Sequence, residues 1–226
     1  MTDPEPAPLP DLLVDRVRAL LGSPPRAAAA ASPGSVPGPR RLLGVTGAPG
    51  AGKSTISARL LAAFGDACVV VPMDGFHLAQ TTLERLGRAD RKGAPDTFDA
   101  AGFVALLHRL RRPVPGETVW APEYRREAHN AIAGALAVPP DVPLVVVEGN
   151  YLLVREHGFA PVAGLLDETW YVAPDDEVRL SRLIARHERF GKPPDAARAW
   201  SLGPDEANAR LIAGTAARAD VVVDPG

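Results

Sequence analysis

The stretch LLGVTGAPGAGKST, residues 42–55, decides the fold class of this 226-residue chain. Within it, Gly47–Ser54 match the phosphate-loop pattern G-x-x-x-x-G-K-[ST] at every fixed position. A buried strand is predicted before the loop, and apolar residues at helical spacing follow it. Glycines let backbone N–H groups surround phosphates, and the start of the next helix adds partial positive charge. The stretch therefore predicts a nucleoside triphosphate site; a dinucleotide fingerprint would need glycine where Pro49 stands.

Each polar residue of this loop has an expected task. Lys53 should reach the β- and γ-phosphates, and the Ser54 hydroxyl should hold Mg²⁺. Thr55 can support the α-phosphate or cap the helix. ATP and Mg²⁺ are therefore the expected cofactors, and the expected cofactor-binding residues are Gly47, Ala48, Pro49, Gly50, Ala51, Gly52, Lys53, Ser54 and Thr55.

Composition excludes several other classes of protein. Apolar residues make up 46%, charged residues 23%, and the formal net charge is −2, which argues against a DNA-coating protein or a polybasic membrane anchor. The single cysteine, Cys68, cannot form an internal disulfide and suits a reducing compartment. We therefore expect a cytoplasmic protein without nucleic-acid or membrane partners, and a homodimer is left open.

Short apolar runs alternate with amphipathic stretches, the pattern typical of a parallel sheet with crossover helices. This predicts an α/β P-loop NTPase fold with a five-stranded, mainly parallel sheet flanked by helices. The expected strands are 42–46, 68–72, 144–148, 169–172 and 221–223, and the expected helices are 53–64, 101–111, 176–190 and 205–217.

Three further segments complete the predicted organisation. Residues 1–39 should form an N-terminal extension: a disordered start over 1–10, a short helix that Asp11 caps and Gly22 ends, and a Pro/Ala/Gly-rich linker. Residues 40–226 should form the P-loop domain. An insertion at about 75–141, between the second and third strands, is longer than a simple connection needs and is expected to bind an acceptor.

Two acidic residues follow predicted strands at the sheet edge where open α/β sheets bind ligands. Asp74 ends the second strand and is expected near the γ-phosphate, where a carboxylate can accept the proton of an attacking hydroxyl. An ordinary Asp-Gly turn is the alternative. Glu148 ends the third strand and is expected beside the metal, directly or through water; a strand-end carboxylate that caps the next turn is the alternative.

The predicted helix 176–190 carries arginines at helical spacing on one face: Arg179, Arg182, Arg186 and Arg189. Asp175 or Asp176 should cap this helix. Such a basic face can close over a triphosphate, neutralise its charge and exclude water. We expect Arg182 and Arg186 to act with Lys53 and Asp74 in catalysis, while a solvated face is as plausible for Arg179 and Arg189.

Four motifs in order carry a family resemblance: the phosphate loop, Val71–Leu78, Arg91–Asp99 and Val147–Leu153. Together they resemble the bacterial nucleoside/nucleotide kinase-like proteins often labelled fructose transport system kinases, and are more distantly similar to uridine kinase, phosphoribulokinase and type I pantothenate kinase. The resemblance implies that Asp74 is the catalytic base, that the loop holds ATP and Mg²⁺, and that Glu148 lies beside the metal.

The resemblance also implies where the acceptor binds. In relatives, the stretches aligned with 91–99 and 124–126 contact the acceptor, which implies Arg91, Lys92, Asp96, Tyr124 and Arg125 here. Uridine kinases carry P-x-Y-D-x-x-x-H in the second stretch; this chain has Arg125 in place of the aspartate and a shifted histidine, which favours a sugar-like acceptor over a nucleoside. His77 could bind the acceptor, orient Asp74 or be structural. The basic residues of the insertion could bind an anionic acceptor or form a solvated cluster.

These residues predict an ATP-dependent kinase that transfers the γ-phosphoryl group to a hydroxyl of a small molecule: a sugar, a nucleoside or a pantothenate-like alcohol. The alternative is a nucleotide-dependent regulatory ATPase or switch without such an acceptor. Asp74-Gly75-Phe76-His77 favours the kinase, since a switch needs an attacking water and not an acceptor pocket.

Overall fold

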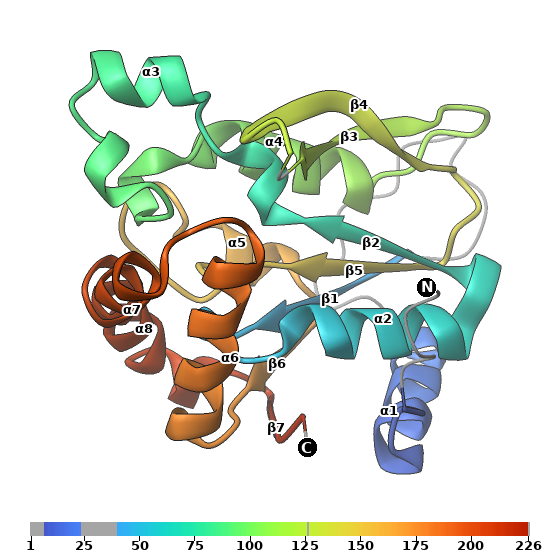
Figure 1. The fold of residues 1–226 in the computed structure, drawn as a ribbon. Helices are drawn as coiled ribbons and strands as arrows, with labels where there is room; N and C mark the ends of the chain where they lie inside the picture. The colour runs from blue at the N-terminus through green and yellow to red at the C-terminus, as the bar shows by residue number, and fades with distance from the viewer. Residues whose placement is uncertain (1–6, 24–39, 126, 226) are drawn as a thin grey trace.

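A computed structural model of the chain describes residues 7–23, 40–125 and 127–225. Its centre is a five-stranded parallel sheet in the order β2-β5-β1-β6-β7 (Figure 1). The strands are β1 (Arg41–Thr46), β2 (Cys68–Pro72), β5 (Leu144–Glu148), β6 (Glu168–Val172) and β7 (Val221–Val223). All five predicted strands are confirmed to within one residue at each end.

The strands form where runs rich in Val and Leu can be buried on both faces of a sheet. All six residues of β1 are buried, and β1 lies at the centre between β5 and β6. The parallel register pairs Val45 with Glu148 and Pro72 with Glu148, so β1, β2 and β5 end at one edge. The residues that follow these strands therefore meet there.

Helices cover both faces of the sheet (Figure 1). One apolar cluster joins Leu42 and Val145 to Phe103, and the other joins Leu43 to Ile56 and Trp170. The helices are α1 (Asp11–Gly22), α2 (Lys53–Phe64), α3 (Gln80–Arg85), α4 (Ala100–Arg111), α5 (Val162–Leu165), α6 (Asp176–Arg189), α7 (Pro194–Leu202) and α8 (Pro204–Ala213). Among the described residues, no helix is long and apolar enough to cross a membrane.

Helix bounds agree closely with the sequence pattern, apart from the last helix. Asp175 caps α6 as expected, because its carboxylate accepts the N–H groups of Glu177 and Val178. The helix expected over 205–217 stops at Ala213, and a separate short turn follows. The helices α3, α5 and α7 were not predicted.

The N-terminal helix packs on the body of the fold. Leu13 and Val17 are buried in the same cluster as Leu43, and Arg41 Nε donates to Leu20 O at 2.9 Å. The prediction of Asp11 as cap is wrong, since Asp11 is the first helical residue and makes no cap. Leu9 is also buried, although it falls in the stretch expected to lack order. Residues 1–6 and the predicted linker over 24–39 lie outside the described residues.

The insertion between β2 and β5 contains an antiparallel hairpin of β3 (Val119–Arg125) and β4 (Asn130–Val138), which was not predicted. The hairpin lies above β2 in Figure 1. A close approach joins it to the end of β2: an ideal Cβ on Gly75 would lie 2.3 Å from Pro122 O. Glycine at position 75 therefore lets the segment that carries Asp74 contact the hairpin directly.

Candidate active site

The phosphate loop connects β1 to α2 and is held between β6 and α6. An ideal Cβ on Gly47 would lie 2.6 Å from Val172 O, and one on Gly50 would lie 2.6 Å from Arg179 O. Both glycines also have positive φ angles, 149° and 83°. These contacts leave no room for side chains, so the loop's backbone stays close to its neighbours.

Lys53 folds back over the loop. Its ammonium donates to Gly47 O at 2.9 Å and Ala48 O at 3.0 Å. Burial lowers the pKa of Lys53 to about 8, although the carboxylates of Glu148 and Asp74 act in the opposite direction. A buried ammonium beside glycine-rich backbone is suited to receive an anion of high charge.

Ser54 and Glu148 meet at the sheet edge, where Ser54 Oγ donates to Glu148 Oε1 at 2.8 Å. Burial raises the pKa of Glu148, opposed by Lys53 and by the Ser54 hydrogen bond. A hydroxyl and a carboxylate are oxygen ligands of the kind that Mg²⁺ takes. Within the described residues no group of three or more His, Cys, Asp and Glu side chains could hold a metal, so Mg²⁺ here would also need phosphate or water ligands.

A cavity of about 810 Å³ lies where these elements meet the insertion. All four residues predicted to be catalytic line this cavity: Asp74, Lys53, Arg182 and Arg186. The phosphate loop, the ends of β2 and β5, the insertion, α6 and the α7–α8 segment each contribute to its lining. Its lining residues include Pro49, Gly50, Gly52, Ser54, Thr55, His77, Lys92, Gly93, Tyr124, Glu148, Asn150 and Arg189.

The insertion forms one wall of the cavity, where the side chains of His77, Tyr124 and Lys92 contact one another. His77 Nδ1 lies 2.9 Å from Asp74 O, and the His77 ring lies 4.9 Å from that of Tyr124. Lys92 Nζ lies 5.4 Å from the Tyr124 ring centre. Asp74, His77, Tyr124 and Lys92 therefore follow one another along the wall.

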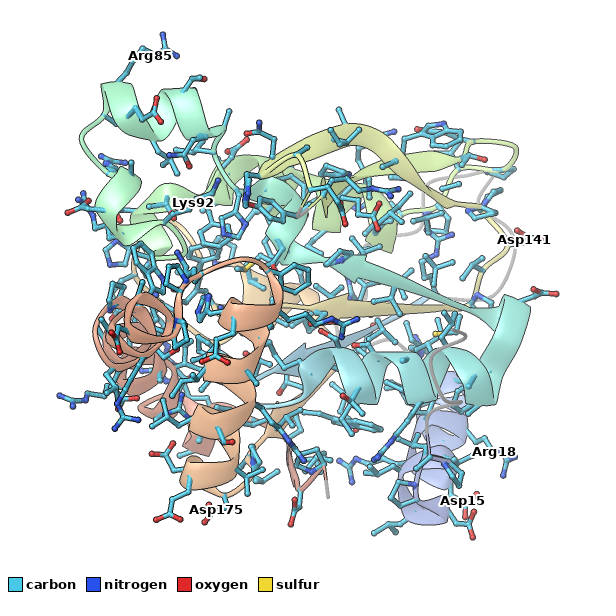
Figure 2. All side chains as sticks on the ribbon, in the orientation of Figure 1. Asp15, Arg18, Arg85, Lys92, Asp141 and Asp175 are labelled. Carbon is cyan, nitrogen blue, oxygen red and sulfur yellow. The ribbon has the colours of Figure 1, made fainter. Side chains whose placement is uncertain are left out.

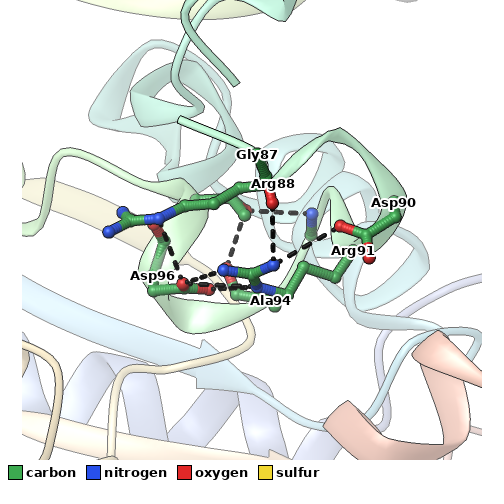
Figure 3. Close-up of polar contacts among 8 residues, drawn as sticks. Gly87, Arg88, Asp90, Arg91, Ala94 and Asp96 are labelled. Atoms are coloured by element: carbon green, nitrogen blue, oxygen red, sulfur yellow. Dashed lines mark hydrogen bonds and ion pairs between the residues drawn. The ribbon is translucent and has the colours of Figure 1, made fainter. Parts of the chain in front are cut away.

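Three of the predicted acceptor residues do not line the cavity. Arg91 Nη2 pairs with Asp96 Oδ2 at 2.9 Å, within a local network that also includes Arg88 (Figure 3). Arg125 Nε pairs with Glu123 Oε2 at 2.6 Å. The adjacent Lys92 faces the cavity instead, since it comes after the turn that holds Arg91.

The arginines of α6 divide into two groups. Arg179 is 5% exposed, pairs with Asp176 and Glu206, and donates to Pro49 O at 3.3 Å. Arg179 therefore fixes α6 to the phosphate loop. This role differs from both sequence-based expectations for this helix face, which were exposure to solvent and closure over a triphosphate. Arg182, Arg186 and Arg189 line the cavity.

Several lining residues were not assigned to the site from sequence. His187 Nε2 lies 2.6 Å from Asp205 Oδ2, which links α6 to α8 beside the cavity. Trp200, on α7, lines the cavity and receives Lys192 Nζ 4.6 Å from its ring centre. The sequence signal that could have predicted α7 is Pro193-Pro194, because proline is favoured at the first position of a helix.

Comparisons with known proteins agree with this geometry. The model of the phosphoribulokinase / uridine kinase family matches residues 42–224. A solved structure from Silicibacter sp. TM1040, described as a candidate fructose transport system kinase, is 37% identical with a TM-score of 0.78, over 94% of this chain and 97% of that one.

Curated relatives extend the same picture. The uncharacterized protein YggC of Escherichia coli strain K12 is 33% identical over 78% of this chain and 74% of its own length. A uridine kinase of Clostridium botulinum strain Okra is 31% identical over 64% of this chain and 68% of its own length. Phosphate loop, fold and relatives thus all indicate a P-loop kinase, and none of them identifies the acceptor.

Proposed function

Because the chain belongs to the phosphoribulokinase / uridine kinase family, we propose that it transfers the γ-phosphoryl group of ATP to a hydroxyl of a small molecule. One observation carries this proposal. The cavity joins the phosphate loop to Asp74 on one side and to the insertion wall on the other, which leaves room for an acceptor beside the triphosphate.

The proposed mechanism depends on positioning and charge. Loop N–H groups, Lys53, Arg182 and Arg186 bind the phosphates, so that Lys53 exchanges the Gly47 and Ala48 carbonyls for phosphate oxygens. Asp74 accepts the proton of the acceptor hydroxyl. The hydroxyl oxygen bonds to the γ-phosphorus, and the bond between the γ-phosphorus and ADP breaks.

Ser54 and Glu148 are the proposed magnesium residues, Ser54 through its hydroxyl and Glu148 directly or through water. Bound Mg²⁺ supplies charge neutralisation of the β- and γ-phosphates. The Ser54–Glu148 hydrogen bond keeps both groups at the end of the loop, where those phosphates would lie.

The acceptor belongs to the classes indicated by the resemblance: sugars, nucleosides or pantothenate-like alcohols. Arg125 argues against a nucleoside, because it stands where uridine kinases carry aspartate, and here it pairs with Glu123 outside the cavity. A relative described as a candidate fructose transport system kinase supports the inclusion of sugars in the first screen.

Kinetics of two substitutions test the proposal. Asp74→Asn should lower acceptor-dependent ADP release about a hundredfold or more, with ATP binding retained, because it removes the general base. Lys53→Ala should weaken both ATP binding and turnover. Asp141→Asn is the matched control, since Asp141 is exposed and distant from the cavity residues (Figure 2). Unchanged turnover in both Asp74→Asn and Lys53→Ala would show that the assignment is wrong.

A further inference from the structure

Lys92 differs from the other basic residues of the insertion that the structure describes. Arg88 and Arg91 pair with Asp96, Arg109 pairs with Glu117, and Arg125 pairs with Glu123. Arg85 lies exposed on α3 and points away from the fold (Figure 2). Lys92 alone of these combines a place in the cavity lining with neutral partners.

The ammonium of Lys92 is held in place by groups that carry no charge. It donates to Gln80 Oε1 at 3.1 Å and to His129 O at 2.8 Å, and it lies over the Tyr124 ring. An ammonium has three N–H donors, so these two hydrogen bonds leave one donor for a ligand. Burial lowers the pKa of Lys92, and no carboxylate among the described residues opposes that effect.

The residues around Lys92 indicate which part of the cavity its ammonium serves. Figure 2 shows Lys92 on the part of the insertion that lies next to the body of the fold. Its neighbours Tyr124 and His77 continue the same wall to Asp74. Lys53, Arg182 and Arg186 lie on the phosphate-loop and α6 sides of the cavity, so Lys92 is not needed to bind the triphosphate there. A half-buried cation without a carboxylate partner is stabilised by an anion.

We propose that the acceptor is an anionic hydroxyl compound whose negative group, a carboxylate or a phosphate, binds Lys92 while its hydroxyl faces Asp74. This inference rests on the proposed function and narrows its substrate class. Short hydroxy acids and sugar phosphates fit it, whereas free sugars and uncharged alcohols do not. Lys92 is then a specificity-determining residue, and the proton transfer stays with Asp74.

Matched pairs of acceptors test this inference directly. The probes are D-glycerate against glycerol, pantothenate against pantothenyl alcohol, and D-ribose 5-phosphate against D-ribose, each with ATP and Mg²⁺. In at least one pair the anionic member should have a kcat/KM higher by about tenfold to a hundredfold, the range expected of one charge-assisted hydrogen bond. The first two pairs report a carboxylate preference, and the third reports a phosphate preference.

Substitutions at the wall then separate specificity from folding. Lys92→Met should raise the KM of the preferred anion about tenfold or more with a smaller change in kcat, and Lys92→Arg should restore much of the loss. Arg85→Met removes the same charge from an exposed place in the insertion and should leave both constants unchanged. Thermal unfolding of each variant shows whether the fold is intact.

Four outcomes would overturn the inference: equal turnover of neutral and anionic members, an unchanged preference in Lys92→Met, an equal loss in Arg85→Met, or no anionic probe phosphorylated by a protein that ATP stabilises. Failure of the proposed function is a separate result. It would be seen as release of the γ-phosphate to water only, or as absence of ATP binding. Phosphorylation of neutral probes would keep the kinase and refute only the role of Lys92.

Discussion

Replacement of Gly75 by alanine should separate the catalytic carboxylate from the acceptor wall. The new Cβ would lie 2.3 Å from Pro122 O and 2.7 Å from Pro122 C, where ordinary contacts begin at 3.4 Å. Both neighbours are backbone, so the segment after β2 or the strand β3 must retreat by about 1 Å. Asp74 lies on one side of that contact and Tyr124 on the other, so their spacing changes.

The expected magnitudes follow from this displacement. Overpacking of this kind costs about 1–3 kcal/mol, which for a chain of this length lowers Tm by about 2–12 °C. A misplacement of about 1 Å can lower turnover about a hundredfold, so kcat/KM for the acceptor should fall by about tenfold to a hundredfold. ATP affinity should change less than about twofold, because the atoms nearest to the new Cβ all belong to Pro122 of the insertion and not to the phosphate loop.

The assay combines coupled ADP release, ATP titration and thermal unfolding. Gly164→Ala is the matched control, because a Cβ there meets nothing within 4 Å. The control should keep wild-type turnover and gain slightly in stability, as expected of alanine in a helix. Gly75→Ala with wild-type acceptor kcat/KM, or with a loss of ATP affinity as large as the loss of turnover, would refute the reasoning.

Three further substitutions address the nucleotide side of the cavity. Lys53→Met should weaken ATP binding and, at pH 7, raise the stability of the ATP-free protein against urea. Burial lowers the pKa of Lys53 in the folded protein to about 8, below its value in the unfolded chain. The wild type therefore gains stability as pH rises from about 8 to 10.5, and the stability advantage of the variant shrinks over that range. Lower stability of Lys53→Met at pH 7 would contradict this. Ser54→Ala removes the hydrogen bond to Glu148 and should raise the Mg²⁺ concentration for half-maximal activity about tenfold, measured at saturating ATP, and an unchanged requirement would remove Ser54 from the metal site. Arg179→Ala should lower the free energy of unfolding by about 2–4 kcal/mol, because it removes the ion pair of a buried arginine with the half-buried Glu206 and takes a donor from the buried Pro49 carbonyl. Arg189→Ala, on the exposed part of α6, should change it by less than about 0.5 kcal/mol, and equal effects would mean that Arg179 does not fix α6 to the loop.

Local patterns were enough to predict the sheet and the phosphate loop. Gly47–Ser54 need their own backbone geometry whatever surrounds them, and the central strands β1 and β5 are buried on both faces, so their apolar pattern is strong. The sequence was also enough to predict that Asp74 and Glu148 lie at the same edge of the sheet, because neighbouring parallel strands end at one edge.

The hairpin was missed because its pattern depends on what packs against it. Pro122 interrupts β3 at a bulge, and β4 contains four alanines and one glycine. Trp120 is 57% exposed on the hairpin, since only one face of these strands packs inward. Sequence alone could not show which face that would be.

Neighbouring basic residues show the same limit within the site. Arg91 and Lys92 are adjacent, and only the fold shows that Arg91 pairs with Asp96 while Lys92 lines the cavity. Helical spacing placed Arg179 and Arg182 on one face, but the partners Glu206 and Pro49 come from distant parts of the chain. Such contacts depend on tertiary packing, which spacing does not contain.

The most direct test of the account is the fate of the γ-phosphate, followed by ³¹P NMR with ATP, Mg²⁺ and the acceptor panel. The account predicts a new phosphate ester that accumulates in equal amount with ADP and forms more slowly, by about a hundredfold or more, with Asp74→Asn. Inorganic phosphate as the sole product, at a rate that no acceptor changes and that Asp74→Asn does not lower, would contradict it.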